Sequence, residues 1–298
     1  MRANEKRDLK SGLGFAALWI VGLSVFTLYP VLASLFYSFS DFSVLEPPVW
    51  IGTGNYERLM HDVVFWKSLK NTLIYTALSL PLGMIVSISL ALLLNTGVRG
   101  MALFRTFFYL PSLVPLVASS MLWLWIFNGN HGILNVALRP IVAVFGAEPP
   151  TWLSDPNWSK PALALMSAWG VGNSMVIYLA GLQDVPQELY ESAELDGAGF
   201  WRRVWHVTLP MISPVIYFNL IMGIIGSLQV FTQVFVMTGG ADGAPARSTL
   251  FYALYLFSTA FYDLRMGYAS AMAWLLFLLI VGLTLLATKL SKSRVHYR

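Results

Sequence analysis

The chain has no cysteine and carries few charges for its length. Cysteine is absent from all 298 residues, which excludes disulfide bonds, thiol catalysis and thiolate metal sites. Only 11% of the residues are charged and 57% are hydrophobic, whereas soluble globular domains contain roughly 25% charged residues. The four histidines, at positions 61, 131, 206 and 296, show no paired spacing of the kind that metal sites use. The composition therefore excludes an ordinary soluble enzyme.

Charge is also absent from six long apolar blocks. Each block contains no Asp, Glu, Lys or Arg and reaches the length of about 20 residues that a membrane-spanning helix needs. The blocks are residues 12–39, 72–94, 106–126, 161–182, 212–237 and 268–288. The sequence therefore predicts an all-α membrane protein with six transmembrane helices. The first block far exceeds the apolar core of a signal peptide, which has roughly 7 to 15 residues, so we interpret it as an uncleaved span.

The distribution of positive charge predicts how the spans are oriented. Twelve of the 19 Lys and Arg residues lie in the two tails and in the segments around Arg99 and Arg202. Positive charge is retained on the cytoplasmic side of a membrane. We therefore expect cytoplasmic tails at 1–11 and 289–298. Residues 12–71 then form the first span and an outer loop, and residues 72–288 form a core of five spans.

Two further absences concern energy coupling. Ion-coupled transporters generally place an ionisable side chain inside the membrane, and the six blocks contain none. No lysine follows a glycine, so the chain also lacks the phosphate-binding loop of nucleotide hydrolases. A secondary transporter would need such a coupling residue, and a membrane-embedded enzyme would need convergent acid and base groups. Both classes remain as alternatives that the sequence does not favour.

The polar side chains of the fourth and fifth blocks have two interpretations. They form hydrogen bonds between helices, or they line an uncharged cavity whose amides and hydroxyls match a sugar or a related polyol. Gln229 and Gln233 are four residues apart, which predicts that both project from one helical face. The candidate pathway residues are Asn173, Ser174, Ser227, Gln229 and Gln233, with Asn219 in the same block and with Trp169, Tyr178 and Phe231 as stacking surfaces.

Five prolines lie inside the blocks, beyond the first residue of each, and predict kinked or broken helices. They are Pro30, Pro81, Pro111, Pro115 and Pro214. Together they suit a helical bundle that opens and closes.

The inner segment 183–211 predicts two short helices. Pro186 suits a first helical turn, acidic residues follow it where the helix dipole favours them, and Gly197 and Gly199 end the helix. A second helix starts at Phe200 and stops at Pro210. Such an amphipathic pair either lies on the lipid surface or docks on another protein.

The spacing within this segment resembles a known signature. Glu191-Ser192-Ala193, Gly197, Val207 and Leu209-Pro210 reproduce the pattern E-A-A-x3-G-x9-I-x-L-P, with Ser192 and Val207 as small departures. On these residues the chain resembles the inner-membrane permeases of binding-protein-dependent ABC importers, which have a MetI-like fold. The surrounding residues, which include Gln183, Pro186, Glu188 and Asp196, resemble the carbohydrate-uptake branch.

Two outer segments support the same family. Residues 231–240, which end in Thr238-Gly239-Gly240, resemble the first permease subunit of the maltose, glycerol-phosphate and lactose importers. Residues 132–135 and 150–155 are similar to the same relatives. The proline that usually follows the glycines is displaced to Pro245, so we expect a differently shaped outer loop.

The resemblance implies a function and a set of partners. It implies a permease subunit of an ATP-driven sugar importer in a bacterial or archaeal cytoplasmic (inner) membrane, with a glycerol-phosphate-type importer as the nearest alternative. The implied partners are a second permease, an ATPase dimer, an extracytoplasmic solute-binding protein and a sugar, with no nucleic acid. No cofactor is expected on this chain, because ATP and Mg²⁺ would bind the ATPase. The implied ATPase-coupling residues are Glu188, Glu191, Ser192, Ala193, Asp196, Gly197, Val207, Leu209 and Pro210.

Overall fold

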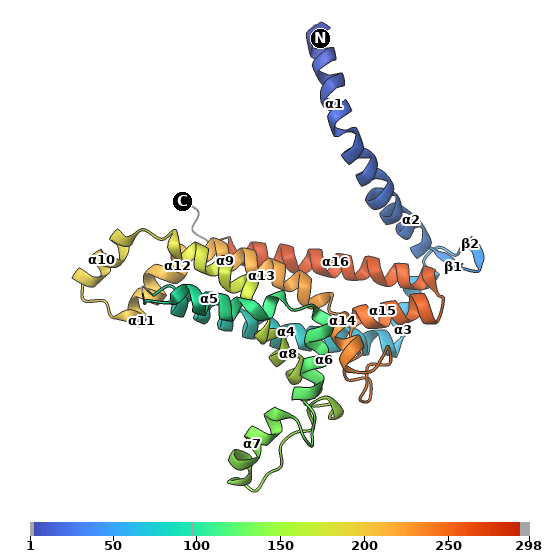
Figure 1. Ribbon diagram of the computed structural model, residues 1–298. Coiled ribbons are helices and arrows are strands. Elements are labelled where there is room, and N and C mark those ends of the chain that lie inside the picture. The colour runs from blue at the N-terminus through green and yellow to red at the C-terminus, as the bar shows by residue number, and fades with distance from the viewer. Residues whose placement is uncertain (1–2, 97, 293–298) are drawn as a thin grey trace. The chain divides into compact units, whose positions relative to one another are not determined.

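The computed structural model describes residues 3–96 and 98–292, and most of their regular structure is helical (Figure 1). Parts of the predicted tails, residues 1–2 and 293–298, lie outside the described residues. The chain divides into two compact units, of which the first comprises residues 1–62 and 256–277 and the second residues 63–255 and 278–298. Each unit is described by itself below.

The first unit contains the N-terminal helices and a short hairpin. Its elements are α1 (Ala3–Leu23), α2 (Tyr29–Ser38), β1 (Ser40–Ser43), β2 (Glu46–Trp50), α3 (Gly54–His61) and the adjoining parts of α15 (Tyr252–Phe257) and α16 (Met266–Ser291). The strands pair antiparallel, with Ser40 opposite Trp50. The buried Asn55 amide donates to the carbonyl oxygens of Ser38 and Ser40, at 3.0 and 2.8 Å, and so fixes the end of α2 against the hairpin. The sequence predicts a first span and an outer loop for residues 12–71, but it does not predict the hairpin within that loop.

The second unit is a helical bundle. Its helices are α4 (Val63–Leu94), α5 (Met101–Tyr109), α6 (Leu116–Ile126), α7 (Ile133–Ala143), α8 (Ser159–Trp169), α9 (Gly172–Gln183), α10 (Gln187–Leu195), α11 (Phe200–Arg203), α12 (Leu209–Met211), α13 (Ser213–Leu228) and α14 (Thr232–Met237). Helix α4 packs against α8, α9 and α13 (Figure 1). One buried cluster forms around Tyr75, Trp123 and Phe251, and a second forms around Ala91, Met175 and Tyr178.

The described helices agree with the six predicted spans. Three continuous helical segments, Ser11–Ser38, Val63–Leu94 and Met266–Ser291, are long and apolar enough to cross a membrane. Three bent pairs supply the remaining spans if each pair is one span: Met101–Leu113 with Leu116–Ile126, Ser159–Trp169 with Gly172–Gln183, and Phe200–Met211 with Ser213–Leu228. The bends at the breaks measure 97°, 50° and 69°, respectively.

The prolines account for part of this bending. Pro111 and Pro115 lie at the 97° break, and Pro214 lies in the first turn of α13, just after the 69° break. Pro30 follows a π-helical turn at Ser24–Leu28, which accommodates its missing N–H. Pro81 lies inside α4, which continues past it. The predicted interruption is therefore confirmed at Pro111, Pro115 and Pro214, and α4 is not broken at Pro81.

The fifth apolar block is not one helix. Helix α13 ends at Leu228 and α14 begins at Thr232. The prediction that Gln229 and Gln233 project from one helical face is therefore wrong. The i to i+4 argument fails because it assumes one continuous helix, and the break at residues 229–231 contains neither proline nor glycine to signal it.

Candidate functional site

The inner segment forms the predicted pair of short helices. Helix α10 ends where Gly197 adopts a φ of +74°. The Gly197 and Ala198 N–H groups donate back to the carbonyl oxygens of Glu194 and Ala193, each at 2.9 Å. This left-handed conformation is one that glycine adopts without strain at a helix C-terminus. Gly197 therefore sets the direction in which the chain leaves α10 toward α11.

Two side-chain contacts hold the helices of this segment together. The Tyr190 hydroxyl lies 3.1 Å from the Thr208 hydroxyl, and the Arg203 guanidinium pairs with the Glu194 carboxylate. The sequence did not predict that Tyr190 pairs with Thr208, because the pairing depends on how the chain turns at Gly197. The two contacts join α10 to the helical segment that follows it.

The surface of this pair exposes both acidic and apolar side chains. Glu188, Glu191, Ser192 and Asp196 are exposed, and Ala193, Val207, Leu209 and Pro210 are half-buried. Large apolar side chains lie exposed beside them, among which Leu195 is 90% and Trp201 is 69% exposed. A charged and apolar surface of this kind is typical of a protein-docking site.

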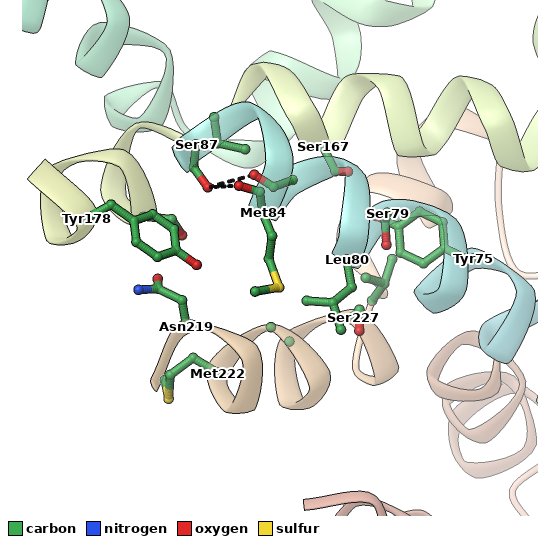
Figure 2. A pocket seen from close by; sticks show the side chains of 16 residues that line it. Tyr75, Ser79, Leu80, Met84, Ser87, Ser167, Tyr178, Asn219, Met222 and Ser227 are labelled. Carbon is green, nitrogen blue, oxygen red and sulfur yellow. Dashed lines mark hydrogen bonds between the residues drawn. The ribbon is translucent and has the colours of Figure 1, made fainter. Parts of the chain in front are cut away.

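A first cavity of about 320 Å³ lies between α4, α8, α9 and α13 (Figure 2). In Figure 2 the Tyr178 ring and the Asn219 amide lie at one end of it, and Tyr75, Ser79 and Ser227 lie toward the other. None of the residues that line it carries a charge. Its polar lining residues are Tyr75, Ser79, Ser87, Ser167, Ser174, Tyr178, Asn219 and Ser227.

Some of these polar groups are free to bind a ligand. The Ser79 and Tyr178 hydroxyls are buried and have no hydrogen-bond partner within the described residues. A buried hydroxyl without a partner costs about 1–3 kcal/mol. Water or the hydroxyl groups of a cargo would relieve that cost, so the cavity is chemically suited to a neutral, hydroxylated molecule.

The predicted pathway residues do not all meet at this cavity. Ser174 and Ser227 line it, whereas Gln233 lines a neighbouring cavity and donates to the Tyr75 hydroxyl at 2.9 Å. Asn173 and Gln229 are exposed and lie outside both cavity linings. Of the stacking candidates, Tyr178 lines the first cavity and Trp169 the second, and Phe231 stacks on Phe235.

One contribution to the first cavity was missed although the sequence contains a signal for it. Tyr75, Ser79, Gly83 and Ser87 line the cavity from α4, and they recur every four residues. Residues four apart lie along one helical face. A polar and small stripe within an otherwise apolar span therefore identifies the wall that α4 supplies.

The outer loop at residues 239–250 is clamped through its backbone. The Lys67 and Lys160 ammonium groups donate to the carbonyl oxygens of Ala246 and Ser248, at 2.8 and 3.0 Å. The Asn71 amide donates to those of Arg247 and Leu250, at 2.9 and 3.1 Å. Ala246 and Arg247 both have positive φ angles. These hydrogen bonds and backbone angles give the loop a defined shape. The displaced Pro245 predicted a different shape but not these contacts.

This clamp predicts a change in protease sensitivity. Replacing Asn71 with alanine removes its two hydrogen bonds to the loop and the one that Lys160 donates to its Oδ1. Trypsin cleavage after Arg247 is therefore expected to rise about tenfold in membranes exposed to protease from the outer face. Asn173→Ala is the matched control, since the Asn173 side chain is exposed. The measurement is the rate of fragment appearance; equal rates for the two variants would contradict the clamp.

The described residues contain no group of three His, Asp or Glu side chains that could hold a metal ion.

Comparisons with known proteins identify the family of this chain. Residues 79–296 match the model of the family described as binding-protein-dependent transport system inner membrane component. The probable ABC transporter permease protein YesP of Bacillus subtilis is 38% identical over 98% of this chain and 94% of its own length. The lactose transport system permease protein LacF of Rhizobium radiobacter is 36% identical, and the match covers 95% of each chain.

A solved structure is similar over nearly the whole chain. It is the crystal structure of a bacterial ABC transporter involved in the import of the acidic polysaccharide alginate. One of its chains matches with a TM-score of 0.81 and 25% identity, over 97% of this chain and 97% of that chain.

Proposed function

This chain belongs to the family of binding-protein-dependent transport system inner membrane components, and on that premise we propose that it forms half of the pathway through which an ATP-driven importer carries a sugar. Its relatives are transport permease subunits, and two of the matched proteins are described as importing or transporting saccharides. The family places the chain in an inner membrane. The orientation with both termini in the cytoplasm rests on the distribution of Lys and Arg.

The uncharged first cavity is the observation that carries the proposal of a sugar. Its polar lining consists of hydroxyls and one amide, with aromatic rings beside them. Sugars present hydroxyl groups at their edges and C–H groups on their faces, which these side chains match. The lining of this cavity carries no cation, so a glycerol-phosphate cargo would need Arg or Lys side chains from the second permease.

The inner helix pair supports a role in energy coupling. Glu188, Glu191 and Asp196 are exposed on it beside large apolar side chains, which suits docking on a cytoplasmic ATPase dimer. ATP and Mg²⁺ would bind that dimer, and closure of the dimer would move α10 and α11. Because Tyr190–Thr208 and Glu194–Arg203 join the pair, the movement would pass to α13 as a rigid-body shift. The cavity would then open alternately to the two sides.

The complete importer would contain this chain, a second permease, two ATPase subunits and an extracytoplasmic binding protein. We expect the purified complex to hydrolyse ATP slowly and to be stimulated several-fold by the binding protein with its saccharide. Measurement of ATPase activity in lipid nanodiscs, with and without the loaded binding protein, tests this expectation. Activity that does not respond to the loaded binding protein would contradict the proposed coupling.

A further inference from the structure

A second cavity, of about 410 Å³, lies where three spans interrupt their helices. Pro111, Ser112 and Val114 line it from the break between α5 and α6. Trp169 and Gly170 line it from the break between α8 and α9, and Gln233 follows the break between α13 and α14. Residues at or next to all three helix breaks therefore line the same cavity.

Helix breaks within membrane spans favour a hydrated cavity. A break leaves backbone N–H and C=O groups without helical partners. Within a membrane, such backbone is tolerated where it is buried in protein or lines a water-filled cavity. The first two breaks also pack closely, since a Cβ on Gly172 would lie 2.9 Å from the Ser112 hydroxyl and 3.1 Å from the Phe108 carbonyl oxygen.

The second cavity has two buried polar side chains in its lining. Ser119 is only 4% exposed and carries a hydroxyl group. Gln233 is 8% exposed, and its Nε2 donates to the Tyr75 hydroxyl. Trp169 adds an aromatic surface. No charged side chain lines the cavity, so its chemistry matches that of a neutral sugar ring.

The two cavities adjoin each other. Ser167 lines both of them. The hydrogen bond between Tyr75, which lines the first cavity, and Gln233, which lines the second, joins the two walls at the same junction. A saccharide chain could thus continue from one cavity into the next while exchanging hydrogen bonds with this pair.

We propose that the second cavity is a second saccharide subsite, so that the pathway holds at least two adjoining sugar residues and favours an oligosaccharide over its monosaccharide. This inference rests on the proposed function as a sugar permease. Each cavity falls within the size range of about 300–1,000 Å³ typical of small-molecule sites. The Ser119 hydroxyl and the Gln233 Oε1 atom supply the donor and the acceptor of the second subsite.

The absence of cysteine provides a direct test of hydration. In the assembled transporter with cysteine-free partner subunits, Ser119→Cys is treated with the cationic thiol reagent 2-(trimethylammonium)ethyl methanethiosulfonate. Leu122→Cys is the matched control, because Leu122 lies on the same helix and is 50% exposed in the unpartnered chain. We expect Ser119→Cys to react at least tenfold faster. Equal or slower reaction would show that lipid or packed protein fills the cavity, which would overturn the proposal.

Cargo length provides the second test. Uptake by the wild-type complex is measured for glucose, maltose and maltotetraose, and for the same length series of any other sugar that the binding protein retains. For Ser119→Leu, the ratio of kcat/KM for the tetrasaccharide to that for the monosaccharide is expected to fall at least tenfold. An unchanged ratio would overturn the second subsite. Absence of ATP-driven uptake of every saccharide by the wild-type complex would instead contradict the proposed function.

Discussion

Replacing Gly197 with valine is expected to reduce ATP-driven uptake roughly 10- to 100-fold while leaving the permease folded in the membrane. Gly197 has a φ of +74°, where a non-glycine residue costs about 1–3 kcal/mol and every 1.4 kcal/mol corresponds to a tenfold change. The strain would turn α11 relative to α10 and disturb the surface proposed to dock on the ATPase. Uptake and co-purification of the ATPase subunits are the measurements.

Gly199 offers a matched control for this substitution. It lies two residues further along the same turn, but its φ of −68° and ψ of 170° belong to the extended region that other residues adopt readily. A Cβ atom would meet no neighbouring atom at either glycine. Gly199→Val is therefore expected to retain uptake within about threefold of the wild type. A loss of uptake equal to that of Gly197→Val would indicate that the backbone conformation at Gly197 is not the cause.

Replacing Ser227 with leucine is expected to abolish most saccharide uptake, by at least tenfold, because the larger side chain would occupy the first cavity. The Ser227 hydroxyl already donates to the carbonyl oxygen of Ile224, at 3.2 Å. Ser227→Ala keeps the cavity open, and we expect it to change uptake by no more than about threefold. Comparing the two variants distinguishes the effect on uptake of filling the cavity from the effect of removing the Ser227 hydroxyl.

Assembly serves as the control for the Ser227 variants. Both are expected to co-purify with the ATPase subunits in wild-type amounts, since Ser227 lies at the C-terminal end of α13, many residues from α10 and α11. Wild-type uptake by Ser227→Leu would contradict the assignment of the first cavity to the pathway. Failure of both variants to assemble would assign Ser227 to helix packing instead.

Much of the fold followed from where charge is absent. Five of the six charge-free blocks coincide with the three long helices and the first two bent pairs, and the fifth block covers α13 and α14, since a charged side chain is costly anywhere in a membrane core. Gly197 as a helix end was predicted because few other residues adopt the left-handed conformation. Signals of this kind depend on one residue or on composition, so sequence alone reveals them.

The features that were missed depend on contacts between distant segments. The Asn55 amide stabilises the β1–β2 hairpin by donating to carbonyl oxygens about 15 residues away. No local sequence pattern predicts such hydrogen bonds. The break at residues 229–231 contains neither proline nor glycine to signal it. It moves Gln229 to an exposed position and directs Gln233 toward Tyr75, which is 158 residues away in the chain. Predicting that pairing required the fold.

Uptake into proteoliposomes tests the central claim most directly. The complete transporter, with ATP enclosed and the loaded binding protein outside, is predicted to accumulate labelled saccharide, and Ser227→Leu is predicted to abolish the accumulation. Accumulation should cease when ATP or the binding protein is omitted. Accumulation that persists without ATP, driven by an ion gradient alone, would contradict the account.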